Sequence, residues 1–123
     1  MLMKATSAPK KAPLSNQLVQ RILRRVPYQE GFRFSRGIGD YTGDVATSLE
    51  DFAEMLKTVD LGSIDFHMDR RDFEKWIRVI FGDDELAQAI YRRTVFQGEN
   101  RRKELMAAVI ARLDELKKMP KTA

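Results

Sequence analysis

The sequence contains no cysteine and only one histidine, His67. The absence of cysteine excludes disulfides, thiolate metal sites and thiol nucleophiles. A single histidine without cysteine also excludes the ligand sets that usually bind zinc. The adjacent carboxylates Asp83, Asp84 and Glu85 are explained by the start of a helix, and no EF-hand loop is present. We therefore expect neither a cofactor nor a metal.

Long apolar runs are missing as well. The longest is a few residues, far below the ~18 that a membrane-spanning helix needs. The N-terminal residues MLMKATSAPKKAPL contain no apolar stretch of signal-peptide length. We expect no membrane span and no export, which makes the cytoplasm the default location.

Charge is abundant but unevenly distributed. The net charge of +4 divides into +7 over residues 1–36, −8 over residues 37–91 and +5 over residues 92–123. Such segregation has two interpretations. The basic ends bind a polyanion, or they fold back on the acidic middle of the same chain or of a second copy.

A chain of 123 residues has room for one domain with a modest core. Residues 1–13 are small, polar and proline-containing, which predicts a flexible basic arm. Residues 14–119 are predicted to form a single globular domain, and residues 120–123 a tail.

The periodicity of the first half predicts a helix and then a hairpin. Leu14–Val26 has helical apolar spacing with Ser15 as its cap. Residues 31–35 alternate aromatic and polar side chains, as a half-buried strand does, and a second strand returns before residue 47. The loop glycines at 37, 39 and 43 do not match the dinucleotide-binding fingerprint, so we interpret them as turn residues.

Several short helices and one long helix are predicted to follow. Thr47-Ser48-Leu49-Glu50 matches a capping box with Thr47 as cap, and Ser63 is expected to cap the next helix. A stripe of Phe73, Trp76, Ile77 and Ile80 is typical of a core-facing helix, which Gly82 ends before Asp83 opens another. The last helix is predicted from Arg101 to Met119. The fold class is α+β, mostly α-helical, with one β-hairpin (about 31–47) packed on a cluster of short helices with a longer C-terminal helix.

Residues 37–90 resemble an uncharacterised, largely archaeal family described as a domain of unknown function (DUF5752-like). The matching features are the aromatic strand, the glycine loop, and the segments ATSLEDFAEMLKTVD, SIDFH, RRDFEKWI and GDDELA. Where such domains commonly have Arg-Gly-Asp-Phe before the tryptophan, this chain has Arg70-Arg71-Asp72-Phe73. The resemblance implies a small archaeal cytoplasmic protein or an appended module, and it implies no catalytic residues.

His67 is the natural candidate for proton transfer because its ordinary pKa is near neutrality. Asp65, Asp69 and Asp72 are close in sequence, but no serine or threonine stands in a nucleophile context. We therefore favour a structural histidine over a catalytic one. Trp76 and the helical phenylalanines are expected in the core. Phe32 and Phe34 could stack on bases, but Asp40 and Asp44 would repel the phosphates.

The preferred function is a non-catalytic binding protein that docks on RNA or a ribonucleoprotein, for example the ribosome, through its basic ends. No base-reading motif is visible, so contacts to the phosphate backbone are expected. The candidate nucleic-acid-binding residues are Lys4, Lys10, Lys11, Arg21, Arg24, Arg25, Arg92, Arg93, Arg101, Arg102 and Lys103. The alternative is a protein-interaction or regulatory module that uses the acidic middle to bind a protein partner or to form a homo-oligomer. A third hypothesis is an enzyme that uses His67 with a neighbouring aspartate.

Overall fold

A computed structural model of the protein describes residues 14–118. The predicted arm and tail lie outside these residues. In chain order the elements are α2 (Asn16–Leu23), the 3-10 turn η1 (Tyr28–Glu30), β1 (Phe32–Ser35), β2 (Tyr41–Ala46), α3 (Leu49–Leu56), α4 (Leu61–Arg70), α5 (Asp72–Trp76), the π-helical turn η2 (Ile77–Phe81), α6 (Asp84–Tyr91) and α7 (Gly98–Lys117). The predicted α+β fold, mostly helical with one hairpin, is confirmed.

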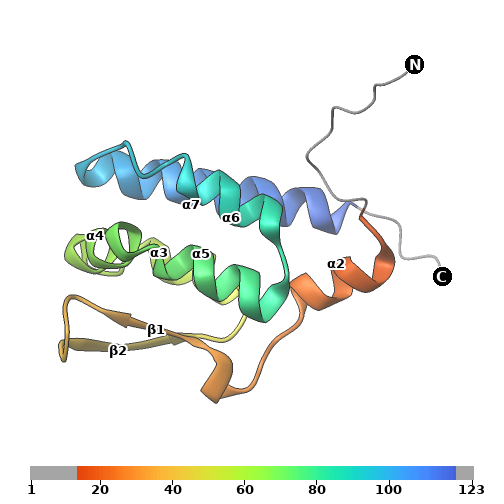
Figure 1. Cartoon of the computed structure of the whole chain (residues 1–123), viewed down its shortest axis with the longest axis horizontal. Helices are drawn as coiled ribbons and strands as arrows, with labels where there is room; N and C mark the ends of the chain where they lie inside the picture. The colour runs from red at the N-terminus through yellow and green to blue at the C-terminus, as the bar shows by residue number, and fades with distance from the viewer. Residues whose placement is uncertain (1–13, 119–123) are drawn as a thin grey trace.

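The elements lie in three levels (Figure 1). The long helix α7 and α6 form one side of the molecule, α3, α4 and α5 lie in the middle, and the hairpin covers the opposite side. Helix α2 stands at one end. The core runs through all the levels, from Val19 and Ile22 in α2 to Leu113 and Leu116 in α7.

The hairpin buries one face against the helices. β1 and β2 pair antiparallel, with Phe32 opposite Ala46 and Arg33 opposite Val45. Since side chains alternate between the faces of a strand, Phe32 and Phe34 point inward and Arg33 points outward. Both phenylalanines are buried and contact Phe52 and Phe73. They are therefore core residues and not a platform for bases.

Helix caps explain where the elements begin, and two of them differ from the prediction. Ser15 accepts from Leu18 N at 3.0 Å, as expected. The cap of α3 is Ser48 rather than Thr47: Ser48 Oγ accepts from Asp51 N at 3.0 Å, and Asp51 accepts from Thr47 N at 3.2 Å. The N-cap of α3 thus lies one residue later than predicted, and Asp51 binds the backbone N–H of the residue before it.

The other correction concerns Ser63, which is buried inside α4 instead of capping it. Asp60 caps α4 by accepting from Gly62 N at 3.0 Å. Gly82, at φ 72°, ends η2 in the left-handed conformation that suits glycine. Asp83 then caps α6 by accepting from Leu86 N at 3.2 Å, as predicted.

The long helix begins three residues earlier than Arg101. Its first turn therefore contains Glu99, whose negative charge suits the N-terminal end of the helix dipole. Arg102 donates to Glu99 across 2.7 Å, which places the positive charge of Arg102 next to that carboxylate. None of the helices in residues 14–118 is long and apolar enough to cross a membrane.

Candidate nucleic-acid interface

The candidate cations of the N-terminal region are partly used inside the fold. Lys4, Lys10 and Lys11 lie outside the described residues. Arg24 donates to Ile80 O at 3.0 Å and thereby binds the carbonyl end of η2. Arg25 pairs with Asp51 at 2.7 Å. Arg21 lies beside Gly82 and is exposed, so it stays accessible to a ligand.

The cations at the start of α7 are divided in the same way. Arg101 is buried and pairs with Asp65 at 2.8 Å and with Asp69 at 3.0 Å, while it also donates to Thr94 O. Arg102 donates to Leu56 O at 2.8 Å and to Val59 O at 2.7 Å. Both guanidinium groups hold the fold together, and Arg101 has no accessible surface for a phosphate. Of these three basic residues at the start of α7, only Lys103 is exposed.

Arg92 and Arg93 follow α6 and differ from each other. Arg93 is half-buried and donates to Ala89 O at 3.0 Å. Arg92 is exposed and lines a cleft that α6 shares with η2, α7 and the N-terminal part of α2. Of this pair, therefore, only Arg92 can readily contact a ligand.

The charge segregation of the sequence is largely resolved within the chain. Ion pairs join the basic ends to the acidic middle at both ends: Arg25 to Asp51, Arg101 to Asp65 and Asp69, Arg112 to Asp83, and Lys117 to Glu50. The strongest burial is at Arg112 and Asp83, whose side chains are 5% and 1% exposed. The interpretation in which the ends fold back on the middle is thus realised in the described structure.

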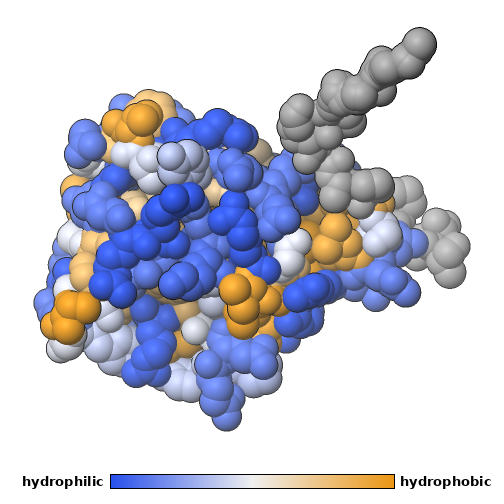
Figure 2. Space-filling view, in the orientation of Figure 1, coloured by the Kyte–Doolittle hydropathy of each residue, from blue (hydrophilic) through white to orange (hydrophobic). Residues whose placement is uncertain are grey.

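A second set of polar side chains, four of them cationic, lies along α5, η2 and α6. We call it the α5–α6 face, and it consists of Arg71, Lys75, Arg78, Gln88, Tyr91 and Arg92. The guanidinium of Arg71 lies 4.4 Å from the centre of the Tyr91 ring. Arg78, Gln88 and Arg92 line one cleft. Figure 2 shows a mainly hydrophilic surface in the region where Figure 1 places α5 and α6.

Two of these cations have carboxylate partners and two have none. Arg71 pairs with the buried Glu74 at 3.0 Å, and Arg78 lies 3.4 Å from Asp84. The side chains of Arg71 and Arg78 remain 56% and 35% exposed. Within residues 14–118, Lys75 and Arg92 form no ion pair, and both are exposed. The face therefore retains positive charge that the fold does not neutralise.

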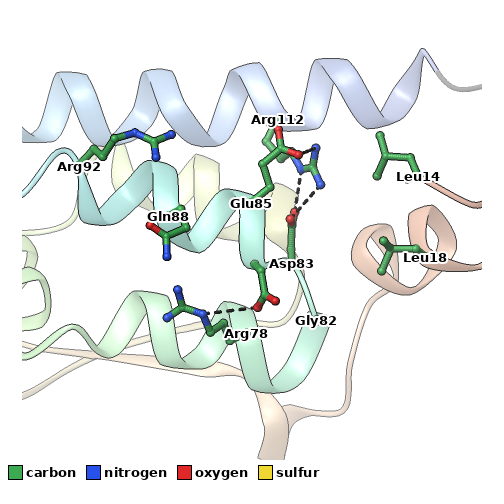
Figure 3. A pocket seen from close by; sticks show the side chains of 10 residues that line it. Leu14, Leu18, Arg78, Gly82, Asp83, Glu85, Gln88, Arg92 and Arg112 are labelled. Carbon is green, nitrogen blue, oxygen red and sulfur yellow. Dashed lines mark hydrogen bonds and ion pairs between the residues drawn. The ribbon is translucent and has the colours of Figure 1, made fainter. Parts of the chain in front are cut away.

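The cleft of about 690 Å³ at the end of this face mixes charges (Figure 3). Gln88, Glu85 and Arg92 come from α6 and its end, and Arg78 comes from η2. On the opposite side lie Leu18 of α2 and Leu14, which precedes that helix. The pair of Asp83 and Arg112 lies in its wall. Arg112 Nε donates to Asp83 Oδ2 and Nη2 donates to Oδ1, both at 2.9 Å. This bidentate pair joins α6 to α7 and fixes the wall of the cleft.

His67 has both ring nitrogens engaged. Its Nε2 accepts from Ser35 N at 2.9 Å, and its Nδ1 lies 2.8 Å from Asp72 Oδ2. The neutral tautomer with a proton on Nδ1 satisfies both contacts. Burial lowers the pKa of His67 below its ordinary value, and Asp72 opposes that shift. His67 thus ties β1 to the junction of α4 and α5.

The surroundings of His67 favour the structural role over the catalytic one. Its ring packs against Phe32 and Phe73 of the core. Asp65 and Asp69, the other neighbouring aspartates in the sequence, bind Arg101 instead. Within residues 14–118, no group of three or more His, Asp or Glu side chains could hold a metal ion.

The sequence does carry a signal for the α5–α6 face. Arg71, Lys75 and Arg78 are spaced by four and three residues, which places them on one side of a helix. They form the polar complement of the apolar stripe of Phe73, Trp76 and Ile77. We missed them because residues 37–91 are acidic overall, and a net charge conceals a local cluster of the opposite sign.

Neither a family model nor a curated protein nor a solved structure matches the chain. The resemblance over residues 37–90 therefore stays a prediction. The function must be argued from the surface that the fold creates.

Proposed function

We propose that the protein is a non-catalytic binding protein that docks on RNA or a ribonucleoprotein, such as the ribosome, through the α5–α6 face. The observation that carries this proposal is the accessibility of four cationic side chains along α5, η2 and the end of α6. Arg71, Lys75 and Arg92 are exposed, and the side chain of Arg78 is 35% exposed. Exposed cations bind phosphates without reading the bases.

The other members of the face suit the same ligand. The exposed amide of Gln88 can donate to a phosphate or a sugar. Tyr91 is 46% exposed and has Arg71 over its ring, so both groups can contact a nucleotide.

The test is the salt dependence of RNA binding. Fluorescence anisotropy of a short labelled RNA strand is measured from about 50 to 200 mM salt for the wild type and for a variant with Lys75→Gln, Arg78→Gln and Arg92→Gln. If each cation meets one phosphate, the slope of log affinity against log salt falls in magnitude by about 2 in the variant, at roughly 0.7 per phosphate of a single strand.

A control variant with the same net charge separates a binding face from general attraction. It carries Lys57→Gln, Lys103→Gln and Lys118→Gln, which are exposed positions outside the α5–α6 face. We expect its slope to match that of the wild type. An equal reduction of the salt slope in the two variants contradicts the proposal. A native preparation that contains a protein partner but no RNA favours the alternative, a protein-interaction module that uses the acidic middle.

A further inference from the structure

We infer that the outer face of the β-hairpin stacks on RNA bases next to the α5–α6 face, so that the protein selects single-stranded RNA over duplex RNA. The inference rests on the proposed function and specifies its ligand. It starts from two exposed tyrosines, Tyr28 and Tyr41, which are 58% and 38% exposed.

The two tyrosines and Arg33 form one ordered cluster. Tyr28 and Tyr41 lie close enough for their hydroxyl groups to shift each other's pKa, that of Tyr28 downward and that of Tyr41 upward. The guanidinium of Arg33 lies 4.2 Å from the centre of the Tyr41 ring. This contact orders the Tyr41 ring while the ring stays accessible, so that little freedom is lost when a base stacks on it.

A second cleft connects this cluster to the α5–α6 face. Its volume is about 390 Å³, and it lies between β1 and the α5–η2 segment. Arg33 lines it on the strand side and Lys75 lines it on the helix side. Val79, which is 66% exposed, and Trp76 give it an apolar lining between the two cations. Because Lys75 also belongs to the α5–α6 face, one strand can contact both surfaces.

The charges around Tyr41 have both signs. Tyr28 raises the pKa of Tyr41, whereas the positive charge of Arg33 lowers it and the negative charge of Asp44 raises it. Because Arg33 and Asp44 act in opposite directions at the ring, the contact expected there is the stacking of an uncharged base. Bases that can stack on protein side chains are those of unpaired strands, since a duplex keeps its bases stacked internally.

The experiment compares three labelled RNAs of equal length: a single strand, the same strand with abasic positions, and a duplex. Stacking on two rings predicts that the wild type binds the single strand at least about tenfold more tightly than the abasic strand. A variant with Tyr28→Ser and Tyr41→Thr should lose this preference and keep the salt slope of the wild type. The control Ile38→Ser, at an exposed position of the same hairpin, should keep both.

The outcomes separate this inference from the proposed function. Equal affinity of the wild type for the intact and abasic strands overturns the stacking contact while salt-dependent binding remains. A tyrosine variant that keeps the preference overturns the assignment to Tyr28 and Tyr41. Absence of salt-dependent binding to all three RNAs overturns the proposed function and this inference together.

Discussion

His67 illustrates how a single titratable side chain links local geometry to the stability of the whole fold. It is the only histidine of the chain, and it is neutral when it accepts from Ser35 N and donates to Asp72. A proton on Nε2 would remove the acceptor for Ser35 N and charge a buried ring. The bond between β1 and the helices therefore depends on the neutral form.

The lowered pKa of His67 predicts a pH-dependent stability with a definite sign. The ordinary pKa of histidine is about 6.5, and that of His67 in the folded chain is lower. Between these two values the unfolded chain binds more protons than the folded one, so the free energy of unfolding rises with pH. The contribution is fully present above about pH 6.5 and is lost as the pH falls through the folded pKa.

Urea denaturation at several pH values, followed by the fluorescence of Trp76, measures this slope. The indole is 8% exposed in the folded protein and so reports unfolding. His67→Gln offers an amide that can accept from Ser35 N but does not titrate in this range. In this variant the free energy of unfolding should rise less steeply with pH, below about pH 6.5, than in the wild type. If the free energy of unfolding depends on pH equally in the two proteins, the pH dependence does not come from His67.

At the scale of elements, the junction of α4 and α5 contains an unusual backbone position. Arg71 has φ 65° and is the only residue other than glycine with positive φ in residues 14–118. This conformation costs a residue with a Cβ about 1–2 kcal/mol. In this chain Arg71 neutralises Glu74, whose side chain is 2% exposed.

We expect Arg71→Gly to destabilise the protein even though glycine suits the backbone. The substitution relieves the strain but leaves a buried carboxylate without its partner, and breaking a buried pair costs about 3–5 kcal/mol. Because the side chain of Arg71 is exposed, we expect the free energy of unfolding to fall by an amount at the lower end of this range or below it. Arg71→Gly combined with Glu74→Met removes the stranded charge and should recover most of the stability.

The measurement is the free energy of unfolding of the wild type, both single variants and the double variant in urea. The four values form a double-mutant cycle that isolates the coupling between Arg71 and Glu74. A more stable Arg71→Gly single variant would mean that backbone strain outweighs the ion pair.

The elements themselves follow well from local patterns, with errors of one to three residues that have physical causes. The hairpin and the stripe of Phe73, Trp76 and Ile77 were predicted because each depends on periodicity alone. The cap of α3 is Ser48 rather than Thr47, because Asp51 and not Glu50 accepts from Thr47 N. Asp51 also pairs with Arg25, a contact between residues that are distant in sequence and that a local pattern does not contain.

For the whole molecule, the roles of the cations could not be read from the sequence. Arg92 and Arg102 belong to the same basic segment, yet Arg92 is exposed and Arg102 has a side chain that is only 15% exposed. The difference arises because α7 packs on α3, where the carbonyls of Leu56 and Val59 lack helical partners. Sequence supplies the charge, and long-range packing decides whether that charge is used in folding or in binding.

We therefore expect opposite effects on stability and on RNA binding from variants of these two arginines that have equal net charge. Arg102→Gln removes two donors to backbone carbonyls and should lower the free energy of unfolding by about 1–3 kcal/mol, while the salt slope of RNA binding stays that of the wild type.

Arg92→Gln changes an exposed side chain and should alter stability by no more than about 0.5 kcal/mol. It should reduce the magnitude of the salt slope by about 0.7, because one phosphate contact is lost. Urea denaturation and fluorescence anisotropy on the same two proteins give both values. A smaller salt slope in Arg102→Gln would mean that the start of α7 belongs to the binding surface. An unchanged salt slope in Arg92→Gln would mean that the end of α6 does not.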